Sequence, residues 1–113
     1  MFLRSALVGS HVALLFYDLP TKTRKDRMAY TIFRKKIRAL GFYFVQKSVY
    51  VKLLEYYDKR IALQRSLENL CPLKGNVRLI YLTVHQYEKG YQIGGEASEA
   101  EKLILHDQQI LEF

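Results

Sequence analysis

Only one cysteine, Cys71, and two prolines occur among the 113 residues. A lone cysteine excludes an intrachain disulfide and a zinc site built from several cysteines, and it fits a reducing cytoplasm. No apolar stretch is long enough to span a bilayer, so no contact with a membrane is predicted. Half of the residues are hydrophobic, which argues against extensive disorder. We expect one folded domain at residues 1–95, followed by an acidic C-terminal segment at residues 96–113.

The basic residues are concentrated in one short part of the chain. The net charge is +7, and residues 22–38 contain eight basic residues but only one acid, Asp26. Residues 96–113 show the opposite balance, with five acids against Lys102 alone. This asymmetry predicts a face that binds a polyanion at one end of the protein and a solvated or partner-binding tail at the other.

An apolar run that ends at Asp18 predicts a buried strand over residues 12–19, which Pro20 terminates. Thr23 and Asp26 have the spacing of a capping box, with aspartate in place of the usual glutamate. The apolar residues that follow recur at helical spacing, and Gly41 provides a stop signal. The chain is therefore expected to pass from a buried strand directly into a basic helix.

The rest of the chain has comparably clear patterns. They predict two strands within residues 42–54, a helix over 58–70 capped by Asp58, a strand over 76–84, a short helix near 86–91, and C-terminal strand pieces at 103–105 and 110–113. The order β-α-β-β-α-β predicts an α+β, ferredoxin-like sandwich with two helices on one face of an antiparallel sheet and an additional C-terminal strand. The other face is rich in apolar candidates, so a homodimer is the expected way to cover it.

Asp18 is the candidate catalytic and metal-binding residue. A carboxylate at a strand end beside a cationic helix suits a divalent cation, a phosphate backbone, or both. One carboxylate is a poor Mg²⁺ site, but a two-fold dimer would bring two copies of Asp18 together. The alternative is that Asp18 only caps the turn at Leu19-Pro20.

The basic helix is the candidate nucleic-acid-binding element. Its arginines are spaced by three, seven and four residues, so they can share one side of a helix and contact phosphates. The predicted nucleic-acid-binding residues are Lys22, Arg24, Lys25, Arg27, Arg34, Lys35 and Arg38. An ordinary solvated helix face is the alternative.

Residues 41–45, Gly-Phe-Tyr-Phe-Val, partly resemble the aromatic motif with which RNA recognition modules stack on bases. That motif belongs on a third strand, whereas this segment is predicted to be the second. Packing in the core or at an interface is the better interpretation of these aromatic residues. A single-stranded RNA-binding module remains an alternative, and it would depend on Phe42 and Phe44.

Several motifs in order resemble CRISPR-associated protein family two, the small subunit of the spacer-acquisition machinery. The motifs are Phe16-Tyr17-Asp18-Leu19-Pro20, Arg24 to Arg27, Gln46-Lys47-Ser48-Val49-Tyr50 and Gly75-Asn76-Val77. The Asp-Leu-Pro, Ser-Val-Tyr-Val-Lys-Leu-Leu and Lys-Gly-Asn segments resemble the branch from systems with a single large effector nuclease. The resemblance extends from Val12 to about Glu96.

The resemblance implies a ferredoxin-like homodimer in which the C-terminal strand reaches across to the partner's sheet. Such a dimer bridges two dimers of the integrase subunit, and the assembly inserts short DNA fragments into the CRISPR array. The leading interpretation is therefore a double-stranded DNA-binding scaffold.

Some members of the family are described as magnesium-dependent endonucleases, including endoribonucleases, that act on RNA or double-stranded DNA. The resemblance places their metal-binding acid at Asp18 and their helix arginines roughly at Arg24 and Arg27. It also places Tyr17 and the Ser48-Val49-Tyr50 element at the active site or dimer interface. Phe44 stands where nuclease-type members carry a basic residue, which puts hydrolysis in doubt without affecting the scaffold role. A magnesium-dependent endonuclease is the main alternative function.

Overall fold

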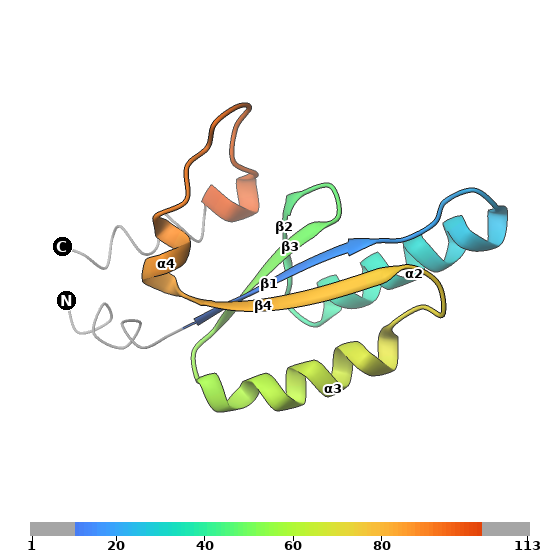
Figure 1. Cartoon of the computed structure of the whole chain (residues 1–113), viewed down its shortest axis with the longest axis horizontal. Helices are drawn as coiled ribbons and strands as arrows, with labels where there is room; N and C mark the ends of the chain where they lie inside the picture. Colours follow the sequence, from blue (N-terminus) through green and yellow to red (C-terminus); the bar gives the residue numbers. More distant parts are fainter. Residues whose placement is uncertain (1–10, 103–113) are drawn as a thin grey trace.

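A computed structural model describes residues 11–102 of the chain (Figure 1). Its elements are β1 (His11–Asp18), α2 (Arg24–Ala39), β2 (Tyr43–Gln46), β3 (Val49–Leu54), η1 (Tyr57–Lys59), α3 (Arg60–Leu70), β4 (Asn76–Thr83) and α4 (Val84–Glu88). The predicted succession of strand, helix, two strands, helix and strand is confirmed. The two strands expected within residues 42–54 form a hairpin whose turn is Lys47-Ser48.

The four strands form one antiparallel sheet in the order β2-β3-β1-β4. The central strand β1 is flanked on both sides, and Val12, Ala13 and Leu15 are completely buried. This explains why the strand is almost uninterruptedly apolar. The architecture is α+β and compatible with a ferredoxin-like fold.

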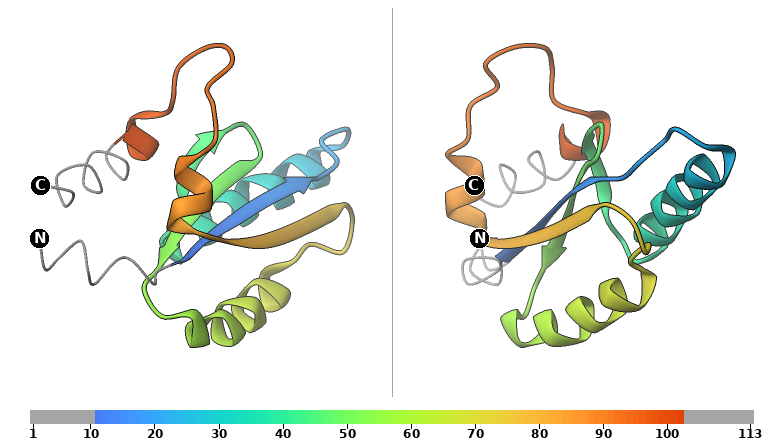
Figure 2. Two further views of the ribbon diagram at one scale, coloured as in Figure 1. Left: turned by 60° about the vertical axis from the view of Figure 1, so that its left-hand side comes forward. Right: turned by 45° about the vertical axis from the view of Figure 1, so that its right-hand side comes forward.

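Alternate residues of β1 face two different layers. Ala13, Leu15 and Tyr17 belong to the core cluster that also contains Phe33 of α2 and Leu67 of α3. Figure 2 shows α2 and α3 on the same side of the sheet. One face of the sheet is therefore closed by these two helices.

The opposite face of the sheet is covered less completely. Val12 packs there with Val51 and Val84, and α4 covers one end of this face. Ile80 of β4 remains 44% exposed. We call this surface the open face.

The two long helices begin in different ways. At α2 the predicted capping box is present: the Thr23 hydroxyl accepts the Asp26 N–H at 3.0 Å, and the Asp26 carboxylate accepts the Thr23 N–H at 3.2 Å. The prediction that Asp58 caps α3 is wrong, because α3 begins at Arg60 without a side-chain cap. The Arg60 guanidinium lies 4.2 Å from the centre of the Tyr57 ring, which favours the 3-10 turn η1 around Asp58.

The chain after β4 turns back toward the sheet. The short helix α4 begins at Val84, slightly before the predicted position, and has its own capping box between Thr83 and Gln86. Residues 99–102 are helical, and the Ser98 hydroxyl donates to the Phe44 carbonyl of β2. The predicted C-terminal strand pieces lie outside the described residues. Within residues 11–102, no helix has the length and apolar character needed to cross a membrane.

Candidate nucleic-acid interface

Asp18 is the last residue of β1, and its side chain is exposed. Its register partner on β4 is Asn76, the first residue of that strand. Directly paired residues on adjacent antiparallel strands place their side chains on the same face of the sheet. Asp18 therefore lies at the edge of the open face, beside the side-chain amide of Asn76, which the sequence analysis named within a motif but gave no role.

Tyr17 lies directly behind Asp18, on the helix side of the sheet. It packs edge-on against Phe33 and Tyr30, at centroid distances of 5.1 and 5.8 Å, and stacks with Tyr50 at 6.2 Å. Burial, together with the neighbouring phenols of Tyr30 and then Tyr50, raises the pKa of Tyr17 well above its usual range. Tyr17 therefore remains neutral at physiological pH and acts as a rigid support under the strand end.

Ser48 connects this support to the hairpin turn. Its φ of 64° is in the left-handed region, which is uncommon for a residue other than glycine. The Ser48 carbonyl accepts the Tyr17 N–H at 3.1 Å, and the Ser48 hydroxyl lies 3.4 Å from the Tyr30 hydroxyl. The structure thus brings Tyr17, Ser48 and Tyr50 together next to Asp18.

Gly75 fixes the position of Asp18 from the other side. It has a φ of +98°, and a Cβ atom there would lie 2.6 Å from the Asp18 carbonyl oxygen and 2.7 Å from Leu19 Cδ2. Only glycine combines this conformation with such a close approach of two backbones. The α3–β4 loop is therefore pressed against the strand end that presents Asp18.

We expect Gly75→Ala to destabilise the fold by about 2–4 kcal/mol, because it adds both a positive-φ penalty and a clash with backbone. Urea denaturation followed by circular dichroism measures this change. Gly94→Ala is the matched control, since a Cβ at Gly94 meets nothing within 4 Å. Equal midpoints for the two variants would contradict the assigned role of Gly75.

The four arginines of the basic helix all lie within α2, at positions 24, 27, 34 and 38. At 3.6 residues per turn these positions share one side of the helix, and all four side chains are exposed. They span about 21 Å along the axis at 1.5 Å per residue. We call this set the arginine row; in the part of the chain that the structure describes, no carboxylate forms an ion pair with it.

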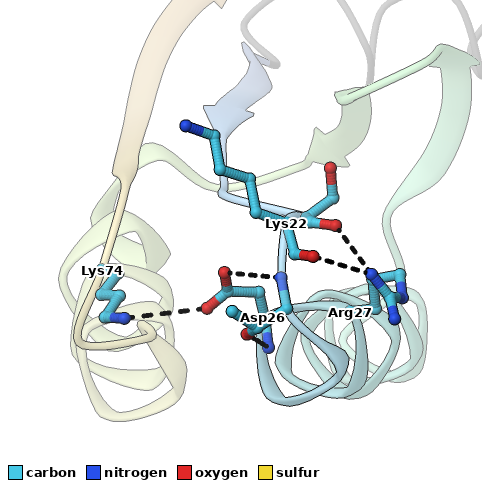
Figure 3. A network of polar contacts seen from close by, with 6 residues as sticks. Lys22, Asp26, Arg27 and Lys74 are labelled. Carbon is cyan, nitrogen blue, oxygen red and sulfur yellow. Dashed lines mark hydrogen bonds and ion pairs between the residues drawn. The ribbon is translucent and has the colours of Figure 1, made fainter.

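The single acid of the basic segment does not neutralise the arginine row. Asp26 accepts the Thr23 N–H and lies 3.9 Å from Lys74 (Figure 3). The hydrogen bonds from Thr23 and the nearby positive charges lower the pKa of Asp26. The positive charge of the arginine row is therefore available to a ligand.

Arg27 is oriented by the loop that follows Asp18. Its Nη1 donates to the carbonyls of Thr21 and Lys22, at 3.3 and 3.0 Å (Figure 3). The remaining guanidinium N–H groups of Arg27 are free of hydrogen bonds to the described residues, and Arg24 lies one turn away. Of the predicted set, Lys22 belongs to the loop that follows Asp18 and Arg24 and Arg27 to the first turn of α2, whereas Arg34, Lys35 and Arg38 continue along the helix. Lys25 lies on a different side of the helix from the arginine row.

The described residues of one chain do not form a metal site by themselves. Within residues 11–102, no group of three or more histidine, cysteine, aspartate or glutamate side chains is placed to hold an ion. Asp18 offers one carboxylate, and Asn76 offers an amide oxygen on the paired strand. Mg²⁺ commonly takes one or two protein carboxylates with water and phosphate oxygens, so these residues fit Mg²⁺ only if a second copy contributes.

The aromatic residues of the hairpin do not form an open stacking surface. Phe42 is buried in the core with 3% exposure, so it is not available to a base. Phe44 is about half exposed, and its ring meets the Tyr50 ring edge-on at 5.7 Å. This arrangement favours packing over the alternative of a single-stranded RNA-binding module.

Comparison with known proteins identifies the family to which this arrangement belongs. Residues 11–90 match the profile of the family described as CRISPR associated protein Cas2. The chain belongs to the Cas2 family. This match covers every strand and both long helices of the structure, including Asp18 and the arginine row.

Three Cas2 relatives, each named CRISPR-associated endoribonuclease Cas2, show the extent of the similarity. The chain is 38% identical to the protein of Treponema denticola over 84 residues, which covers 74% of this chain and 83% of that protein. It is 37% identical to that of Streptococcus mutans strain NN2025 over 83 residues, covering 74% and 78%. It is 40% identical to that of Acidovorax ebreus over 75 residues, covering 66% and 72%.

Three contributors to the site were not predicted from the sequence. Tyr30 contacts Ser48, Asn76 pairs with Asp18, and Gly75 packs against the strand end. Tyr30 does lie three residues before Phe33 on the buried side of α2, which is a periodic signal for an inward position. Asn76 and Gly75 are distant from Asp18 in sequence, and only the pairing of β4 with β1 brings them there.

Proposed function

We propose that this Cas2-family protein is a dimeric scaffold that binds double-stranded DNA in CRISPR adaptation and bridges integrase dimers during spacer acquisition. The arginine row is the observation that carries the proposal. Its exposed guanidinium groups, which form no ion pair with the described carboxylates, extend about 21 Å along one helix, far more than a single small anion needs. Membership of the Cas2 family supports a role for this surface in the CRISPR system.

The proposed contacts are to phosphates rather than to bases. The arginine row lies on the solvent side of α2, whose opposite side is anchored in the core by Phe33 and Ile37. Because the helix is packed on the sheet, it presents positive charge and is not free to enter a DNA groove and contact bases. Backbone contacts position a protein on DNA and carry little sequence information. We therefore infer binding with little sequence preference.

The proposed dimer is formed through the open face. This face retains partly exposed apolar residues such as Ile80, while the helix layer carries the arginine row on the other side. A second copy packed on the open face would leave both arginine rows accessible. We further propose that residues 96–113 extend to the partner copy, and that the protein belongs to the branch with a single large effector nuclease.

The test is a salt titration of duplex binding by the purified protein. We expect the logarithm of the association constant to fall linearly with the logarithm of salt between about 50 and 300 mM, with a slope of about −0.9 for each phosphate neutralised. Two duplexes of unrelated sequence should give the same line. Binding that is insensitive to salt, or that requires one sequence, would refute the proposal.

The second candidate function is a metal-dependent endonuclease, which the name endoribonuclease of the curated relatives favours. Asp18 of two copies would hold Mg²⁺, and the ion when bound would activate water and stabilise charge on the phosphate. Asn76 is placed to help orient the Asp18 carboxylate, and the arginine row would hold the substrate backbone. Against this function, Phe44 of the neighbouring hairpin stands where nuclease-type members carry a basic residue.

A further inference from the structure

A cavity of about 260 Å³ lies in the helix layer, close to the Asp18 end of the sheet. It is bounded by the start of α2, the β1–α2 loop and the α3–β4 loop. Its apolar walls include Leu19, Ala29 and Pro72, with the Tyr30 ring beside them. We call it the α2 groove.

The rim of the α2 groove is positively charged. Lys25 and Lys74 are exposed lining residues, and Asp26 is the only acid of the lining. The Asp26 side chain is only 11% exposed, since it serves the capping box and the ion pair with Lys74 (Figure 3). The lining therefore carries two lysines against one carboxylate, which lies 3.9 Å from Lys74, so its net charge is positive.

A large apolar side chain is exposed at the α2 groove. Leu73 is fully exposed at its edge, in the α3–β4 loop. On α2, Ala29 lines the groove and is exposed, on the same side of the helix as Lys25. An apolar cavity with an exposed leucine at its edge and lysines on its rim is characteristic of a protein-binding surface.

We propose that the α2 groove docks an acidic segment of a partner protein that inserts a leucine- or phenylalanine-type side chain into the cavity. Phosphate backbones gain nothing from apolar walls or from an exposed Leu73, so a protein segment fits better than nucleic acid. The lysines of the rim complement carboxylates that flank the inserted side chain. The groove also remains accessible when the open face is covered by a second copy.

This inference rests on the proposed function, under which the partner is the integrase subunit. Helix α2 then serves two ligands. Its arginine row contacts DNA, and the side that carries Lys25 and Ala29 contacts protein. The notable consequence is that DNA binding and partner binding are separable by mutation.

The experiment measures binding of the purified integrase subunit from the same CRISPR locus by biolayer interferometry. We expect Leu73→Ser and Lys74→Gln each to weaken binding about tenfold or more, which is the effect of losing an interface hot spot. Ile61→Ser is the matched control, because Ile61 is 51% exposed on α3 and does not line the groove. All three variants should bind duplex DNA as the wild type does.

Each other outcome is decisive. Integrase binding by Leu73→Ser and Lys74→Gln at wild-type affinity would overturn the groove proposal and leave the proposed function intact. Failure of the wild type to bind the integrase subunit at all would overturn both. Loss of DNA affinity in Leu73→Ser with normal integrase binding would show that the groove serves nucleic acid instead.

Discussion

Replacing all four members of the arginine row with glutamine should weaken duplex DNA binding by about a hundredfold or more near 0.1 M salt. The reason is counterion release: each phosphate contact that is lost also removes about 0.9 from the salt slope. The change is amplified in a dimer, because every substitution occurs twice on one DNA. Fluorescence anisotropy with a labelled duplex, repeated at several salt concentrations, measures both the affinity and the slope.

The matched control for this variant removes the same number of positive charges elsewhere. Lys59, Arg65, Lys89 and Lys102 are exposed and lie outside α2, so their replacement by glutamine lowers the net charge equally. If both variants lost affinity to the same extent, net charge rather than the arginine row would explain binding. Because Arg27 donates to the Thr21 and Lys22 carbonyls, circular dichroism must show that the glutamine variant keeps its fold.

The parts of the fold that were predicted correctly are those with local causes. The β1 strand could be predicted from its apolar run. The run is apolar because β1 lies between β3 and β4 and most of its side chains are buried. The start of α2 could be predicted from the sequence because the side chains of Thr23 and Asp26 each accept the other residue's backbone N–H within one turn. The side of α2 that carries the arginine row follows from spacing alone. In each case the chemistry lies within a few residues of the chain.

The prediction that failed, and the residues that were missed, depend on contacts between distant segments. Asp58 was expected to cap α3, but packing of Arg60 on Tyr57 and the hydrogen bond from Tyr81 to the Arg60 carbonyl place the helix start later. Gly75 acts on Asp18 only because β4 pairs with β1.

The α2 groove likewise exists because two loops from different parts of the chain meet at one end of α2. Lys25 was grouped with the arginines from composition. In the structure it lines the groove, on a different side of the helix from the arginine row. Spacing was sufficient to predict that the four arginines share one side of α2, whereas the groove beside Lys25 depends on the α3–β4 loop and is visible only in the structure.

Replacing Asp18 with alanine should leave duplex binding intact or slightly tighter, and should reduce any magnesium-dependent cleavage to background. Binding is retained because Asp18 is exposed and belongs to neither the core nor the arginine row. It becomes slightly tighter because removal of a carboxylate near the phosphate path reduces repulsion. Cleavage requires Asp18 because, of the residues described, it supplies the only carboxylate at the strand end, and Mg²⁺ depends on such a group.

The control for Asp18→Ala is Asp58→Ala, which removes an exposed aspartate of η1, a 3-10 turn outside the candidate site. Duplex binding is measured with EDTA, and cleavage of RNA and DNA with Mg²⁺, on the same protein samples. Cleavage that persists in Asp18→Ala would mean that another protein in the sample, or another site, breaks the bond. Wild-type protein that binds duplex without cleaving it would instead favour the scaffold function. Asp18 would then have no catalytic role and would be an exposed residue at the end of β1, where Gly75 and Tyr17 hold the backbone in place.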